Sequence, residues 1–171
     1  MQRALSQRGD MAESVSFSSD DKSTRYRELA VQLASIVDGE SDLVANLANA
    51  TAVIRDCVPA ASWVGFYLRR GSELVLGPFQ GKLACVRIAM GKGVCGTAAA
   101  KQETLVVPDV AAFPGHIACD AGSRSEIVVP IVVSGEVVAV LDLDSYQPAA
   151  FDDVDAAGLA PVAEVLATLG W

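Results

Sequence analysis

A short segment between Pro114 and Pro130 gathers the residue types that carry out thiol or metal chemistry. It reads PGHIACDAGSRSEIVVP and contains the chain's single histidine, His116, three residues before Cys119. Asp120 follows at once, and Glu126 stands just ahead of an apolar run. Negative neighbours discourage the formation of a thiolate. Cys119 is therefore open to three interpretations: a metal ligand with His116, a nucleophile, or a small buried hydrophobic residue.

A zinc site is the first of these alternatives. The other cysteines, at positions 57, 85 and 95, lie 62, 34 and 24 residues upstream of Cys119, and the chain has no C-x-x-C pair. Structural zinc needs four nitrogen or sulfur ligands, usually in closely spaced pairs. The spacing therefore disfavours a metal site, and we interpret His116 as a hydrogen-bonded structural residue.

A glycine-rich motif, GKGVCG at 91–96, formally matches the G-x-G-x-x-G pattern of dinucleotide-binding turns. However, no acidic residue follows ~20 positions later, and the next strands look antiparallel rather than doubly wound. We therefore expect a tight turn into a short helix, with Cys95 near the helix N-terminus. That position lowers the pKa of a thiol.

Three carboxylates lie on two apolar runs that have the pattern of strands. Asp142 and Asp144 in EVVAVLDLDS share one face, because side chains alternate along a strand. Whether Glu126 joins them depends on the hairpin at Ser134-Gly135. A two-residue loop puts Glu126 on the opposite face. A three-residue loop, 133–135, pairs position 126 with 142 and gives Gly135 the left-handed conformation that this turn class favours. A pocket built from all three carboxylates requires this second register.

Such a carboxylate cluster needs a physical reason to persist, since like charges facing each other across a sheet are destabilising. It is tolerable if a cation occupies it or if one member keeps a proton. The cluster would suit a ligand ammonium group, a Mg²⁺ or Ca²⁺ ion, or a general acid. The plain alternative is a solvated strand end. Trp63 and Tyr67 share one strand face, so they either wall a cation pocket or are ordinary core aromatics.

Hydrophobic periodicity predicts the elements that must position these residues. Two amphipathic helices cover 26–37 and 43–57, with Ser41 as a candidate N-cap and Cys57 on the apolar stripe of the second. Strands are predicted at 62–68, 73–77, 84–88, 103–110, 126–133 and 136–144, with a short helix at 94–102. A final helix at 152–170 contains Pro161, which we expect to bend or split it. This order indicates an α+β fold with a mainly antiparallel sheet of about six strands.

The composition sets the broad class of protein. The chain has 171 residues, 51% hydrophobic and 20% charged, which predicts one folded domain. The net charge of −8 argues against a nucleic-acid partner, and no apolar run is long enough to span a membrane. Residues 1–21 are expected to form a disordered tail with no targeting signal and with Met11 as an alternative start, so that 22–171 is the domain. The four cysteines are then expected to be reduced thiols in the cytoplasm.

Six runs of sequence carry a pattern of their own: WVGFYL (63–68), LGPFQGKLAC (76–85), GKGVCG (91–96), VVPDV (106–110), FPGHIACDAGSRSEIVVP (113–130) and VLDLDS (140–145). Together they resemble the free methionine-R-sulfoxide reductases, which are single-domain members of the GAF fold. General GAF sensor domains share the sheet and the glycine turn but not the set Cys85, Cys95 and Cys119 with GHIACD and DxDS. The resemblance extends from about Tyr26 to the C-terminus, and one departure is Tyr146, where a proline often follows DxDS.

The resemblance implies an enzyme without a cofactor or metal, with its N- and C-terminal helices packed on one face of a GAF-like sheet. Such an enzyme reduces free L-methionine (R)-S-oxide to L-methionine and is recycled by thioredoxin. By match to the family motif, Cys119 is the nucleophile and Cys85 the resolving cysteine, while Cys95 can join disulfide exchange. The family also favours homodimers, and the two N-terminal helices could supply an apolar dimer face.

The same resemblance implies a substrate site lined by Glu126, Asp142 and Asp144, with Trp63 and Tyr67 as its aromatic wall. The ammonium group of a free amino acid explains why an acidic pocket is tolerable. A carboxylic acid whose pKa is raised by like-charged neighbours can also donate a proton near neutral pH. Two other interpretations remain open: a non-catalytic GAF module that binds a small effector, and a thiol redox sensor.

Overall fold

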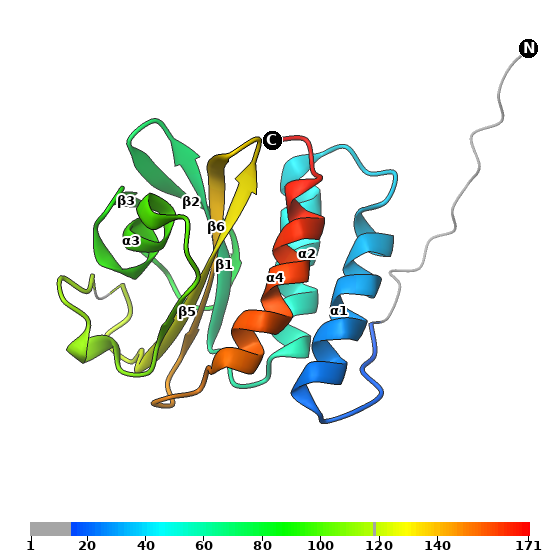
Figure 1. Cartoon of the computed structure of the whole chain (residues 1–171), viewed down its shortest axis with the longest axis horizontal. Coiled ribbons are helices and arrows are strands. Elements are labelled where there is room, and N and C mark those ends of the chain that lie inside the picture. The colour runs from blue at the N-terminus through cyan, green and yellow to red at the C-terminus, as the bar shows by residue number, and fades with distance from the viewer. Residues whose placement is uncertain (1–14, 118) are drawn as a thin grey trace, which may run out of the picture.

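The computed structural model describes residues 15–117 and 119–171. Figure 1 shows a curled sheet with the long helices on one side and a short helix on the other. Within the described residues the sheet has six antiparallel strands in the order β3-β2-β1-β6-β5-β4. The elements are α1 (Lys22–Val37), α2 (Leu43–Cys57), β1 (Trp63–Arg70), β2 (Glu73–Gln80), β3 (Arg87–Ala89), α3 (Gly93–Lys101), β4 (Leu105–Val107), the 3-10 turn η1 (Val110–Ala112), β5 (Ser125–Val133), β6 (Glu136–Ser145) and α4 (Asp153–Ala167).

The two faces of the sheet bury two separate apolar cores. The larger core lies on the side of the long helices, where α2 and α4 cover the sheet and α1 packs against both of them, and Leu141 and Leu143 of β6 belong to it. The smaller core lies on the opposite face with α3, and Val140 of β6 belongs to that one. The predicted α+β fold is thus confirmed, with the first and last helices packed on the same face (Figure 1).

The two edge strands are shorter than the sequence predicts. The strand expected at 84–88 is reduced to Arg87–Ala89, and the one expected at 103–110 is reduced to Leu105–Val107. Pro108, which has no backbone N–H to offer a neighbouring strand, follows β4 directly. The residues just before β3 instead form a loop, and Cys85 in this loop packs against the smaller core.

Aspartate side chains cap the N-termini of the long helices. The Asp21 carboxylate accepts a hydrogen bond from the Thr24 backbone N–H at 2.9 Å and caps α1. Asp42 does the same for α2 by accepting from the Ala45 N–H at 2.8 Å. The expectation that Ser41 is this cap is therefore wrong, because Asp42 is the residue directly ahead of the first helical turn.

Helix α4 starts with a capping box and stays continuous. The Asp152 carboxylate accepts from the Asp155 N–H while the Asp155 carboxylate accepts from the Asp152 N–H. The helix then runs from Asp153 to Ala167 with Pro161 inside it, so of the two effects expected of this proline, a bend or a split, the split is wrong. Proline removes one intrahelical hydrogen bond, but the buried face around it, including Leu159 and Val162, anchors both halves to the larger core.

The β5–β6 hairpin differs from the register that the sequence favours. Its loop has two residues, Ser134 and Gly135, both with positive φ (52° and 82°), and Val133 pairs with Glu136. That loop alone would turn Glu126 to the opposite face. A bulge next to Val132 shifts the register by one residue, however, so that Glu126 pairs with Asp144 rather than with Asp142. All three carboxylates therefore share a face, by a different route from the one expected.

The N-terminal end of the described chain lies along α1. The backbone N–H groups of Ser16 and Ser18 donate to the side chains of Gln32 and Glu28, and Phe17 packs against the larger core. The remainder of the expected tail, 1–14 with Met11, lies outside the described residues. None of the described helices combines the length and apolarity that crossing a bilayer would require.

Candidate functional site

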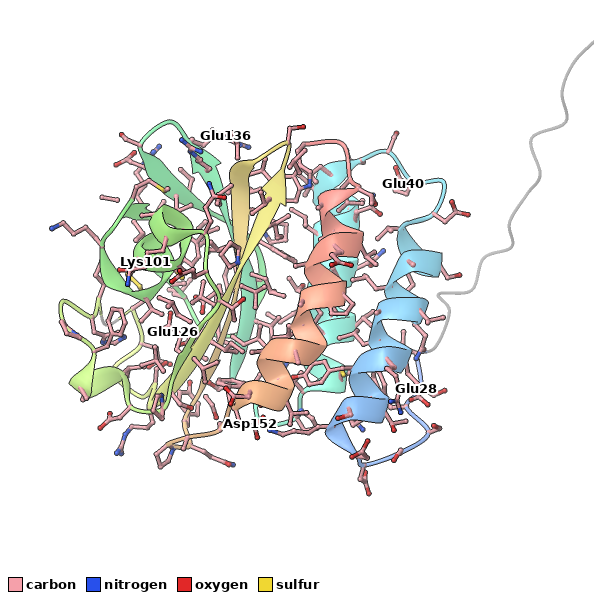
Figure 2. All side chains as sticks on the ribbon, viewed as in Figure 1. Glu28, Glu40, Lys101, Glu126, Glu136 and Asp152 are labelled. Carbon is pink, nitrogen blue, oxygen red and sulfur yellow. A yellow bond between two sulfur atoms is a disulfide. The ribbon has the colours of Figure 1, made fainter. Side chains whose placement is uncertain are left out.

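The face of the sheet turned toward α3 carries a row of carboxylates beside aromatic rings. In the central strands, Trp63 of β1 pairs with Asp144 of β6, and Asp144 pairs in turn with Glu126 of β5. Directly paired residues point to the same side of an antiparallel sheet, so these three side chains adjoin. Asp142 precedes Asp144 by two positions on β6 and therefore lies on the same face. Figure 2 shows Glu126 on the α3 side of β5, away from the three long helices.

Gly65 makes room for the aromatic part of this face. A Cβ at this position would lie 2.3 Å from the Trp63 ring and 2.5 Å from the Phe79 Cβ. With only hydrogen there, the Trp63 ring stacks on Phe79, with centroids 5.4 Å apart, and on Tyr67 at 6.1 Å. The two aromatic residues named by the sequence, Trp63 and Tyr67, are therefore brought together as expected.

These aromatic rings also hold a loop across the site. The Trp63 indole N–H donates to the Lys82 carbonyl oxygen at 3.0 Å, and the Tyr67 hydroxyl donates to the Cys85 carbonyl oxygen at the same distance. Both hydrogen bonds fix the backbone of the loop that precedes β3. The aromatic wall thus sets the position of Cys85, a role that the sequence analysis did not assign to it.

Cys85 and Cys119 form a disulfide across the mouth of the site. Their Cα atoms lie 5.2 Å apart although 34 residues separate them in sequence. The pairing implied by the family resemblance is present in the structure. Cys119 is consequently not free to bind a metal ion with His116, and both residues line the same cavity.

Cys95 lies deeper, near the start of α3, with its thiol unpaired to any other sulfur. The turn Gly91–Gly96 leads into this helix as expected, with the Gly91 N–H donating to the Gly96 carbonyl oxygen. The Cys95 thiol donates to the Glu126 Oε1 at 3.8 Å. Burial, followed by the charges of Asp142 and Glu126, raises the pKa of Cys95 well above its ordinary value. The expectation that the helix N-terminus lowers the pKa of the Cys95 thiol is wrong, because desolvation and the negative neighbours outweigh the effect of the helix.

The three carboxylates favour bound protons. Burial and the charge of Asp144 raise the pKa of Glu126 to about 8. Burial raises the pKa of Asp144 to about 6. For Asp142, burial and the charges of Asp144 and Glu126 raise the pKa well above its usual range. A site of this kind holds at least one carboxylic acid near neutral pH, which can donate a proton to a bound molecule.

Asp142 and His116 are two polar side chains whose surroundings in the site could not be predicted from the sequence. Asp142 Oδ1 is buried and has no hydrogen-bond partner within the described part of the chain. His116 Nε2 lies 3.8 Å from Glu126 Oε2, and burial lowers the pKa of the imidazole below its usual 6.5. His116 therefore faces the carboxylate cluster as a neutral ring at neutral pH, in addition to belonging to the loop.

A second link between the two cysteine loops was missed by the sequence analysis. The Tyr146 hydroxyl donates to Asp120 Oδ2 at 2.7 Å, and Lys82 lies both 3.6 Å from that carboxylate and over the Tyr146 ring. Lys82 precedes Cys85 by three residues and Asp120 directly follows Cys119. The only signal in sequence was the departure from the family pattern at Tyr146. This contact joins the loops on either side of the disulfide.

All of the sequence-predicted site residues except Cys85 line one cavity of about 40 Å³, and Cys85 is joined to it through its disulfide with Cys119. Its floor is the strand face, α3 forms one side, and the two cysteine loops form the other. Among the described residues, one His, Cys, Asp or Glu group is compact enough to share an ion: Cys95, Glu126 and Asp142. The cavity is lined by Trp63, Tyr67, Leu83, Ala84, Ile88, Gly93, Val94, Cys95, His116, Ile117, Cys119, Asp120, Ser123, Glu126, Asp142 and Asp144.

Comparison with known proteins places this architecture in a family. The family model described as "GAF domain" matches residues 39–169. A solved structure of free methionine-R-sulfoxide reductase from Neisseria meningitidis, in complex with its substrate, superposes with a TM-score of 0.87 at 51% identity, covering 90% of this chain and 93% of that one.

Two curated relatives carry the same name. The free methionine-R-sulfoxide reductase of Escherichia coli is 46% identical and covers 86% of this chain and 92% of its own length. That of Saccharomyces cerevisiae is 43% identical, with 91% of each chain covered. The chain therefore belongs to the GAF domain family, and within it to the free methionine-R-sulfoxide reductase family.

Proposed function

We propose that the chain reduces free L-methionine (R)-S-oxide to L-methionine with its own cysteine thiols. The observation that carries this proposal is the Cys85–Cys119 disulfide at the mouth of a buried carboxylate pocket. A redox-active cysteine pair supplies the two electrons that the reduction needs. The carboxylates supply both a counter-charge for an ammonium group and a proton for the departing oxygen.

Recognition of a free amino acid follows from the charge of the pocket. Glu126 and Asp142 are buried with the partly buried Asp144 beside them, so an ammonium group placed among them would offset their repulsion. The stacked rings of Trp63 and Tyr67 would cover its apolar part. A methionine sulfoxide inside a peptide has no ammonium group, and for this reason we expect the enzyme to reject it.

The chemical step starts from the reduced enzyme. The Cys119 sulfur attacks the sulfoxide sulfur, and a protonated carboxyl of the cluster donates a proton to the sulfoxide oxygen. The oxygen passes to Cys119, so methionine leaves and a sulfenic acid remains on that residue. Glu126, whose pKa is raised to about 8, is protonated at neutral pH and suits the role of donor.

Resolution then regenerates the enzyme. The Cys85 thiol attacks the sulfenic acid, water leaves, and the Cys85–Cys119 disulfide forms. Thioredoxin, as a dithiol, reduces this disulfide by thiol–disulfide exchange and restores both thiols. Cys95 is available as a further thiol for exchange, although its buried, proton-holding environment makes it a slow one.

This cycle fits a chain that works in the reducing cytoplasm with thioredoxin as its partner and without a cofactor. We also propose a homodimer, for which exposed apolar residues on the first two helices, Val31 and Val44, offer a contact face. Residues 22–171 are proposed as the complete catalytic domain, with the segment before it as a tail.

A coupled assay tests the proposed function. NADPH consumption is followed with thioredoxin and thioredoxin reductase, using free methionine (R)-S-oxide, the free (S)-S-oxide and a peptide that contains the sulfoxide. We expect turnover with the free R form only. Consumption with peroxide but with no sulfoxide would instead identify a thiol redox sensor. A chain that turns over none of these compounds but binds a metabolite in titration calorimetry would be a sensor module.

A further inference from the structure

The floor of the cavity holds a thiol and two carboxylates in one compact group. Cys95 Sγ, one oxygen of Glu126 and one oxygen of Asp142 all lie within 4.8 Å of one another, and all three residues are buried. Ligand atoms around a tetrahedral zinc ion stand about 3.3–3.8 Å apart, given Zn–S of ~2.3 Å and Zn–O of ~2.0–2.2 Å. Small side-chain rotations would bring the three atoms to that spacing.

Asp142 provides a second, independent sign of a missing ligand. Its Oδ1 is buried without a hydrogen-bond partner among the residues that the structure describes. Burying an unpaired polar atom is unfavourable, and this is more severe for a charged group. The residue lines the cavity, so the free oxygen has a donor or a cation as its natural partner there.

His116 offers a fourth ligand atom from the opposite wall, next to Glu126 but outside the group of three whose atoms lie within 4.8 Å of one another. Its Nε2 lies 3.8 Å from Glu126 Oε2, and the side chain is only 17% exposed. One thiol, one imidazole and two carboxylates form a mixed donor set. Sulfur and nitrogen donors favour Zn²⁺ over Mg²⁺ and Ca²⁺, which prefer oxygen ligands only.

We propose that Cys95, Glu126 and Asp142, with His116 as the fourth ligand, bind one Zn²⁺ ion. The ion binds the Cys95 thiolate and the two carboxylates, and the thiol proton together with any proton held by Glu126 or Asp142 passes to the buffer. Because Glu126 and Asp142 are also the residues to which we assign the substrate ammonium group, zinc excludes the substrate. Zinc thereby inhibits the reductase reversibly. This last step rests on the proposed function, whereas zinc binding itself does not.

The ligands come from four separate parts of the chain, which is why their spacing in sequence carries no zinc signature. Cys95 belongs to α3, Glu126 to β5, Asp142 to β6, and His116 to the loop before Cys119. The hairpin bulge brings Glu126 to the face that carries Asp142. The cavity of about 40 Å³ exceeds the ~10–15 Å³ that a single water requires, so an ion has room there.

Titration calorimetry on the disulfide form of the full chain tests the site directly. No reductant is present, so Cys85 and Cys119 stay paired and cannot compete for the metal. We expect one Zn²⁺ per chain, and Co²⁺ in its place is expected to give the absorption of a thiolate–cobalt bond. Cys95→Ser should abolish that absorption and weaken zinc at least ~100-fold, while His116→Ala should weaken it about tenfold.

The matched control is Cys57→Ser. Cys57 is the other free buried cysteine, but it lies in the larger core on the opposite face of the sheet. This variant should bind zinc like the unmodified chain. Asp142→Asn removes the unpartnered oxygen by a near-isosteric change and should weaken zinc as Cys95→Ser does. Urea unfolding of each variant confirms that it is folded before its binding is measured.

Failure of the zinc site and failure of the proposed function are separable. Zinc binding is measured without substrate, and turnover is measured once with a chelator present and once with added zinc. The site is refuted if the unmodified chain binds no stoichiometric zinc, or if Cys95→Ser and Asp142→Asn bind it unchanged. Loss of binding in Cys57→Ser would also contradict it. Zinc that binds at the site but leaves turnover unaffected would refute the inhibition alone.

Discussion

Replacing Glu126 with glutamine should remove a defined part of the pH dependence of stability. Burial and the charge of Asp144 raise the pKa of Glu126 from 4.5 to about 8 in the folded chain. The folded state therefore holds a proton that the unfolded state has lost, over the range between these two values. In that range the free energy of unfolding falls as pH rises. The stabilising effect of this proton is complete below the unfolded pKa and is lost as pH passes the folded one.

The size of the effect follows from the pKa values. One proton difference changes the free energy of unfolding by about 1.4 kcal/mol per pH unit. Between about pH 6.5 and 8, allowing for partial ionisation near the folded pKa, the loss is roughly 1.5–2 kcal/mol. This window also separates the carboxylates from the imidazole and the thiols. His116 has a lowered pKa, so it changes the free energy of unfolding mainly below pH 6.5. The thiols of Cys57 and Cys95 have pKa values raised from 9.0, so their effect on stability falls mainly above the window.

Urea unfolding at several pH values in this window, with the disulfide intact, measures the prediction. The unmodified chain should lose stability toward pH 8, and Glu126→Gln should lose less by about the amount given. Burial is the first cause of the raised pKa of Asp142, so the contribution of Asp142 stays in the variant. Glu103→Gln, which changes an exposed glutamate, serves as the control and should keep the original slope. A flat profile for the unmodified chain, or an unchanged slope in Glu126→Gln, would refute the reasoning.

Three further predictions concern the cysteine loops and the helix layer. Cys85→Ser should release about one equivalent of methionine in a quenched reaction and then stop until an external thiol is added, since no partner resolves the sulfenic acid; repeated turnover without a thiol would contradict this role. Tyr146→Phe removes the hydroxyl that donates to Asp120 at 2.7 Å. The loss should lower the effective concentration of the Cys85 thiol toward Cys119 by up to about tenfold, in line with ~1.5 kcal/mol for a charged hydrogen bond. An unchanged equilibrium between the disulfide and glutathione would argue against this contact. Gly158→Ala places a Cβ 2.3 Å from the Tyr26 ring, so it should cost about 1–3 kcal/mol in urea unfolding, and an unchanged midpoint would count against this packing.

The layers of the fold could be predicted from the sequence because each has its own period. The stripe that contains Leu29 and Leu33 identifies α1, and the alternation of Leu141 and Leu143 with Asp142 identifies β6. Both signals depend on burial, which dominates in long elements. Short edge strands have less to bury, so their ends were predicted too far out. Pro161 was overestimated as a breaker because tertiary packing of α4 outweighs one lost hydrogen bond.

The members of the site could also be predicted, but their exact arrangement could not. The residues came from the family resemblance and from the residue types, and all of them except Cys85, which is bonded to Cys119, line one cavity. The pairing of Glu126 with Asp144 depends on a bulge next to Val132, in a run of valines where no residue type marks one. The pKa of Cys95 depends on three-dimensional burial beside Glu126, which outweighs the local effect of the helix. Registers and desolvation of this kind are properties of the packed structure.

Single-turnover release of methionine by the Cys119→Ser variant tests the central claim most directly. The reduced enzyme is mixed with excess free methionine (R)-S-oxide without thioredoxin, quenched, and assayed for methionine. The unmodified chain should release about one equivalent and acquire the Cys85–Cys119 disulfide, whereas Cys119→Ser should release none. Release of a full equivalent by Cys119→Ser would contradict the assignment of Cys119 as the attacking thiol.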